Sequence, residues 1–129
     1  MGDFKRLVAW QKANAFALAV HAALKGTRAH VSPGLRAQIL RAVNSIGDNF
    51  AEGCSKRSPR ALASSADCAY SESKEVENQL IKSRGLRILD RHEFEDLITQ
   101  CDEVSRLWFG LSRMRTTKDP DPRFGDQEV

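Results

Sequence analysis

The chain has 129 residues, which fits a single domain, and its 41% hydrophobic and 29% charged residues are typical of an ordinary globular protein. No apolar run approaches the roughly 18 residues of a membrane-spanning helix, and the opening Met-Gly-Asp-Phe-Lys-Arg lacks the apolar core of a signal peptide. We therefore expect a cytoplasmic chain without a membrane segment, whose net charge of +3 identifies no partner by itself.

Apolar residues recur at helical spacing in four segments, and the 4 prolines and 8 glycines fall mostly between them. We predict helices over about 4–25, 33–53, 59–84 and 91–114. Four amphipathic helices with short connections predict an all-α, antiparallel up-down-up-down four-helix bundle over residues 1–115. The remaining segment, 116–129, is polar with little to bury, and we expect a mobile tail.

The first two predicted helices have clear apolar stripes. Gly26 ends the first, and residues 27–31 form a linker. Ser32 is an N-cap and Pro33 a first helical residue for the second, which Gly53 is expected to end. The stripes contain Trp10, Ala13, Ala17, Val20 and Leu24 in the first helix, and Leu35, Ile39, Ala42, Val43, Ile46 and Phe50 in the second.

The third and fourth predicted helices carry matching seams with heptad-like spacing. Ser58 and Pro59 begin the third helix, Gly85 ends it, and Asp90 with Glu93 forms a capping box for the fourth. The seams contain Leu62, Ala66, Ala69, Ser73, Val76 and Leu80 in the third helix, and Phe94, Leu97, Cys101, Val104, Trp108 and Leu111 in the fourth.

Several apolar residues fall outside these stripes: Val8, Leu18, Leu40, Leu107 and Phe109. A second partial stripe favours a subunit interface, and hence an oligomer. The alternative is a set of scattered surface residues, which are normal in soluble proteins.

The cysteines predict neither disulfides nor a metal site. Cys54, Cys68 and Cys101 are an odd number without a CxxC pair, and we expect Cys68 and Cys101 to be small core fillers. His21, His30 and His92 have no recognised zinc-ligand spacing relative to them. We expect no cofactor.

The basic residues gather at both ends of the predicted bundle. One end collects Lys5, Arg6, Lys56, Arg57, Arg60, Arg113 and Arg115, and the other Lys25, Arg28, Arg36, Lys82, Arg84, Arg87 and Arg91. Cations at helix C-termini complement the macrodipole, but Arg36, Arg60 and Arg91 lie in first turns, where a cation is unfavourable.

The candidate nucleic-acid-binding residues are Lys56, Arg57 and Arg60, which we call the basic elbow. The alternative is a solvated elbow without a partner. No aromatic residues are interleaved with it, and we expect Tyr70 and the tryptophans to lie in the core rather than to stack on bases.

The sequence lacks the motifs of an enzyme. It has no Gly-rich phosphate loop and no nucleophile elbow. Asp48 and Glu52 lie four residues apart, which is more typical of a solvated or capping pair than of a catalytic one. Leu89 stands three residues before His92, so the Glu-x-x-His pattern of di-metal bundles is absent. We predict a non-enzymatic protein without a small-molecule substrate.

Three blocks of sequence stand out in order along the chain: Phe4-Lys5-x-Leu7-x-x-Trp10-Gln11-Lys12-Ala13, then Gln38-x-x-Arg41-Ala42-x-x-Ser45-Ile46-x-x-Asn49-x-Ala51-Glu52-Gly53, and Glu75-Val76-Glu77-x-Gln79-Leu80. Together they resemble a bacterial family of four-helix bundles related to proteins encoded in 23S rRNA intervening sequences. The chain departs from the family pattern at Phe50 and Glu72.

This resemblance implies a left-handed antiparallel bundle, assembled as a ring-like homo-oligomer, with a pentamer favoured, and no known catalytic activity. Distant relatives with this fold are accessory proteins of diversity-generating retroelements, which are basic rings that bind a reverse transcriptase and nucleic acid. Within the central block, four polar residues share one side of the helix and are candidates for a subunit interface or a polar ladder: Arg41, Ser45, Asn49 and Glu52.

Together these features predict an oligomeric binding module that contacts RNA, DNA or a ribonucleoprotein through basic bundle ends. The alternative is a protein–protein interaction scaffold with no nucleic-acid role.

Overall fold

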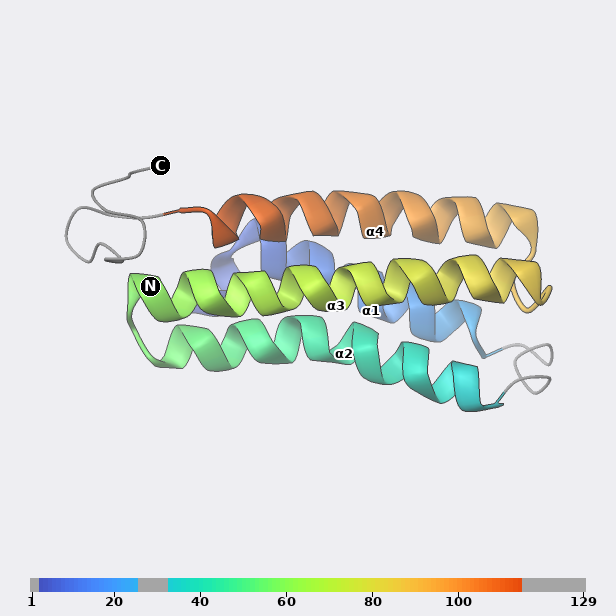
Figure 1. Ribbon diagram of the computed structural model, residues 1–129, viewed down its shortest axis with the longest axis horizontal. Helices are drawn as coiled ribbons and strands as arrows, with labels where there is room; N and C mark the ends of the chain where they lie inside the picture. Colours follow the sequence, from blue (N-terminus) through green and yellow to red (C-terminus); the bar gives the residue numbers. More distant parts are fainter. Residues whose placement is uncertain (1–2, 26–32, 115–129) are drawn as a thin grey trace.

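The computed structural model describes residues 3–25 and 33–114, which fold into four helices lying side by side along one long axis (Figure 1). They are α1 (Val8–Ala23), α2 (Pro33–Ser55), α3 (Pro59–Gly85) and α4 (Arg91–Ser112), preceded by a 3₁₀ turn η1 (Phe4–Arg6). Helix α3 packs extensively on α2 and α4, and α1 packs on the same two helices. Helices α1 and α3 are therefore diagonal, and the all-α four-helix bundle is confirmed.

Several sequence predictions lie outside the described residues. They concern Gly26, the linker 27–31, Arg28, His30, Ser32, Arg115 and the tail 116–129, and they stay predictions.

The capping signals act as predicted at two helix starts. The Ser58 hydroxyl accepts a hydrogen bond from the Ala61 N–H at 3.2 Å, and Pro59 follows as the first residue of α3. Asp90 accepts from the Glu93 N–H at 2.7 Å, while the Glu93 carboxylate accepts from the Asp90 N–H at 2.9 Å. Both ends of this capping box satisfy backbone donors that α4 leaves unpaired.

The first helix begins later than its apolar spacing predicts. Leu7 is extended, with φ −81° and ψ 132°, and this interrupts the helix between η1 and Val8. Asp3 caps η1 by accepting from the Lys5 N–H at 3.1 Å. The segment around Phe4 is nevertheless held to α1, because the Phe4 and Trp10 rings lie 5.1 Å apart edge to face.

Gly53 does not end α2, which continues to Ser55. Gly53 is buried, and a Cβ built on it would overlap the Cβ and Oγ of Ser65 on α3. The glycine is thus required by the close approach of two helices and not by a turn.

The core is formed by the predicted seams. Phe16, Phe50 and Trp108 are completely buried, and the Phe50 and Trp108 rings pack 4.5 Å apart. The Phe50 side chain, where the chain departs from the family pattern, therefore fills space against Trp108 of α4. None of the described helices is long and apolar enough to cross a bilayer.

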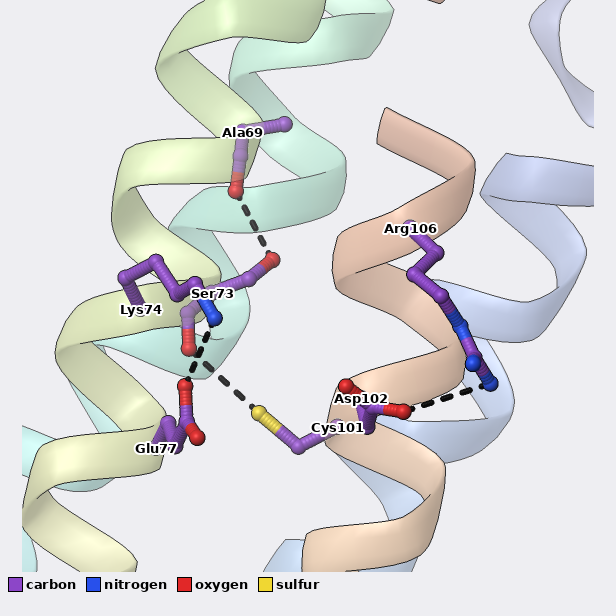
Figure 2. A network of polar contacts seen from close by, with 7 residues as sticks. All are labelled: Ala69, Ser73, Lys74, Glu77, Cys101, Asp102 and Arg106. Carbon is purple, nitrogen blue, oxygen red and sulfur yellow. Dashed lines mark hydrogen bonds and ion pairs between the residues drawn. The ribbon is translucent and has the colours of Figure 1, made fainter. Parts of the chain in front are cut away.

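The cysteine prediction is correct for Cys101 and wrong for Cys68. The Cys101 thiol is buried and donates to the Ser73 carbonyl oxygen on α3 at 3.3 Å, as Figure 2 shows. Burial raises the pKa of Cys101 to about 12, so it remains a protonated core thiol at neutral pH. Cys68 is exposed. Ala66 and Ala69 lie three residues apart on the core side of α3, and Cys68, between them in sequence, lies on the outer side of the helix.

Candidate nucleic-acid interface

The basic elbow joins α2 to α3 at one end of the bundle, where α4 also terminates (Figure 1). The N–H of Lys56 donates to the Gly53 carbonyl oxygen, and that of Arg57 to the Cys54 carbonyl oxygen, each at 3.2 Å. Arg57 has a φ of 54°, in the left-handed region. The side chains of Lys56, Arg57 and Arg60 are all exposed, so the chain brings the three candidates together on one solvent-facing turn.

The helix dipole opposes one of the three elbow cations. Because α2 extends to Ser55, Lys56 and Arg57 directly follow its C-terminus, where a cation is favourable. Arg60, the second residue of α3, remains in an unfavourable first-turn position.

The other two cations in first turns have local partners. Arg36 donates through Nε to the Leu24 carbonyl oxygen at 3.2 Å, joining α2 to the end of α1. Arg91 donates to Glu95 at 3.3 Å. These two arginines therefore stabilise the fold locally.

Ion pairs between described residues lie on the helices, away from Lys56 and Arg57. They join Lys12 to Glu103, Arg41 to Glu75, Lys74 to Glu77, Arg91 to Glu95 and Arg106 to Asp102. At the elbow end, Lys56, Arg57 and Arg113 have no carboxylate within ion-pair distance in the part of the chain that the structure describes. Lys56, Arg57 and Arg113 are thus exposed cations that no carboxylate of the described residues pairs.

The four polar residues of the central block do not form one ladder. Arg41 donates through Nη2 to Glu75 on α3 at 2.8 Å, and Glu75 also accepts from Gln79 at 3.3 Å. Ser45 donates to the Arg41 carbonyl oxygen at 2.8 Å.

Asn49 and Glu52 are exposed and make no side-chain hydrogen bond or ion pair within residues 3–25 and 33–114. The central block is instead connected to the Glu75–Leu80 motif, because Arg41 reaches across to α3. The contact between these two motifs was not predicted from the sequence, because it depends on how α2 packs on α3.

Sequence reasoning also missed an aromatic pair on the surface between α3 and α4. Tyr70 is half-buried against the core, and its ring lies 5.3 Å from that of Phe109, which is 43% exposed. The Lys74 ammonium lies 5.7 Å from the Tyr70 ring centre, and the Arg113 guanidinium 4.9 Å from that of Phe109. The position of Phe109 outside the seam was the available signal, but its partner depends on the register of two helices.

The described residues hold no cluster of three or more His, Cys, Asp or Glu side chains suited to a metal ion. His21 instead shares a 3.0 Å hydrogen bond with the Asn44 side-chain oxygen, which links α1 to α2.

A family model described as 23S rRNA-intervening sequence protein matches residues 5–110. Among solved structures, the chain is similar to a protein of unknown function from the S23 ribosomal protein family of Bacteroides thetaiotaomicron. The two share 20% identity with a TM-score of 0.71, over 83% of this chain and 100% of the other. At this identity the similarity shows a common fold. No curated protein matches the sequence.

Proposed function

The chain belongs to the 23S rRNA-intervening sequence protein family, and from this premise we propose that it is a non-enzymatic, oligomeric binding module of the cytoplasm. Its basic elbow contacts the phosphates of nucleic acid. The observation that supports this proposal is the group of exposed cations at the elbow end, where Lys56, Arg57 and Arg113 lack a carboxylate partner among the described residues.

The chemistry of this end suits a polyanion better than a small anion. Lysine and arginine side chains on an exposed turn neutralise phosphates by charge and release condensed counterions, so binding weakens steeply as salt is added. Phosphate contacts position a nucleic acid without reading its bases. We therefore expect salt-sensitive binding with little dependence on base sequence.

The proposed assembly uses the outward side of α1. Val8, Ala15, Leu18 and Ala22 are exposed there, with Val8 at 57% and Leu18 at 63%. Positions 8, 15 and 22 are spaced by seven, which is the repeat of a helix-packing seam. We call these four residues the α1 outer face. An α-helix that is apolar on its outer side as well is typically covered by another protein surface.

Two residues of the second stripe do not contribute to this face. Leu40 and Leu107 are half-buried and pack against the chain's own core. The α1 outer face lies on the helix diagonal to α3, and we expect a second copy bound there to leave the elbow open. A closed ring of copies would repeat the elbow and raise the affinity for a long polyanion through multivalency. A pentamer is the favoured size.

Replacing the elbow cations tests the nucleic-acid contact. Lys56→Ala, Arg57→Ala and Arg60→Ala together are expected to weaken binding to a short RNA duplex and to reduce the slope of log affinity against log salt by about two to three, one for each lost phosphate contact. Fluorescence anisotropy over a salt series measures both quantities.

The matched control removes three exposed cations from the opposite end of the bundle: Lys25, Lys82 and Arg87. We expect this triple alanine variant to bind as the unaltered protein does. Equal losses in the two variants would mean that net charge alone drives binding. An unchanged affinity in the elbow variant would remove the elbow from the proposal and favour a protein scaffold without a nucleic-acid role.

Arg57 allows stability and binding to be separated. A non-glycine residue in the left-handed region carries a cost of roughly 1–2 kcal/mol, so Arg57→Gly is expected to stabilise the fold by about 1 kcal/mol while weakening RNA binding. Arg87 has a φ of 61° in the turn after α3, and Arg87→Gly should give the same stabilisation without a loss of binding. Urea unfolding and anisotropy measure the two effects. Unimpaired RNA binding by Arg57→Gly would contradict a role for this arginine.

A further inference from the structure

We propose that the Tyr70–Phe109 pair, with Arg113, is a stacking site for unpaired bases of a single-stranded nucleic acid whose phosphates reach the basic elbow. This proposal rests on the nucleic-acid function proposed above and adds that the bound nucleic acid is single-stranded. Exposed aromatic rings beside cations are the usual means of holding single strands without sequence preference.

The aromatic pair is a fixed and accessible feature. Other large aromatic side chains, such as Phe16, Phe50 and Trp108, are completely buried, whereas Phe109 is 43% exposed. Its ring is supported by Tyr70, which packs on the core. A ring held by a packed neighbour loses little conformational entropy when a base stacks on it.

The register of α3 and α4 places this pair on the elbow side of the molecule. Cys101 contacts Ser73, and Phe109 contacts Tyr70, so α4 runs antiparallel to α3. The end of α4 therefore lies beside the start of α3. Arg113, one turn beyond Phe109, therefore lies toward the elbow. Along α3, Arg60 and Tyr70 are separated by about 15 Å of helix, a span that a strand of a few nucleotides crosses.

Two cations, Lys74 and Arg113, lie beside the rings and can attract an anionic strand. Lys74 pairs with Glu77 at 3.0 Å and Arg106 with Asp102 at 3.2 Å, so these two carboxylates are neutralised locally, as Figure 2 shows. The hydrogen bond from Lys74 to Glu77 also raises the pKa of Lys74. Arg113 has no carboxylate within ion-pair distance among the described residues, and its guanidinium lies over the Phe109 ring at 4.9 Å, where a base can stack on the guanidinium plane.

Single strands fit this arrangement better than duplexes. The bases of a duplex are already stacked inside it, while those of a single strand can stack on an aromatic ring or an arginine plane. The aromatic rings of the site therefore add affinity for oligonucleotides that carry free bases and none for the sugar–phosphate chain alone.

Three probes of equal length test the proposal with the full chain: oligodeoxythymidine, an abasic deoxyribose-phosphate oligomer and a DNA duplex. Phe109→Ala is expected to weaken oligodeoxythymidine binding roughly tenfold and to leave the abasic and duplex affinities unchanged. Phe109→Leu keeps the apolar bulk without an aromatic face and should lose the same preference. Ile81→Ala, at an α3 residue that is 53% exposed, is the matched control and should bind like the unaltered protein.

The outcomes separate this proposal from the elbow's function. Unchanged oligodeoxythymidine binding by both Phe109 variants would overturn the stacking site, while loss of all binding in the elbow variant would still support the elbow. If the unaltered protein binds none of the probes, both proposals fail. A smaller mass of Phe109→Ala in light scattering would assign Phe109 to a subunit contact and would also overturn the stacking site.

Discussion

Gly53→Ala is expected to lower the free energy of unfolding by about 2 to 3 kcal/mol, as overpacking of a close helix contact does. The added Cβ would overlap both side-chain heavy atoms of Ser65. Ser65 Cβ is fixed to the α3 backbone, so rotation of the hydroxyl does not make enough room and the two helices must separate. Urea unfolding, followed by helical circular dichroism, measures the loss.

Two further variants isolate the cause. Gly110→Ala adds the same methyl group on α4, where nothing lies within 4 Å, and should stabilise the helix by about 0.5–1 kcal/mol. Ser65→Gly removes the clashing atoms, so its combination with Gly53→Ala should recover part of the lost stability. Equal stability of Gly53→Ala and the unaltered protein would contradict a close α2–α3 contact at this residue.

Leu18→Glu is expected to convert the proposed oligomer into monomers. Leu18 is 63% exposed in the single chain, so a carboxylate there costs the monomer little. In a packed interface the same carboxylate would be buried without a partner, a change that costs several kcal/mol per copy. Light scattering coupled to gel filtration measures the mass, and thermal unfolding of the monomer checks that the fold is retained.

Asn78→Glu is the control for added charge. Asn78 is exposed on α3, between Lys74 and Lys82 at one helical turn on either side, where a glutamate forms favourable pairs. This variant should keep the mass of the unaltered protein. An unchanged mass for Leu18→Glu would exclude the α1 outer face as the contact between copies.

The features that the sequence predicts well are local. Ser58 and the Asp90–Glu93 box cap their helices because each interaction spans three residues, and the core seams follow from helical spacing alone. Gly53 was misassigned as a helix end because a glycine signal has two physical causes. Only the neighbouring helix shows that this one is a close approach.

The candidate site depends more strongly on tertiary packing. The sequence places Lys56, Arg57 and Arg60 on one turn, but only the structure shows that α2 continues two residues past Gly53 and ends directly before Lys56. The pairing of Tyr70 with Phe109 depends on the register between α3 and α4, which no local pattern determines. For the same reason, the ion pair between Arg41 and Glu75 could not be found from either helix alone.

Light scattering of the purified protein at low and high salt, with and without a short RNA duplex, measures the assembly and the RNA contact in one experiment. The proposed function predicts an oligomer that keeps its mass at both salt concentrations and gains mass with RNA at low salt only. An oligomer whose mass RNA does not change at low salt would contradict the nucleic-acid function, and a monomer at both salt concentrations would contradict the assembly.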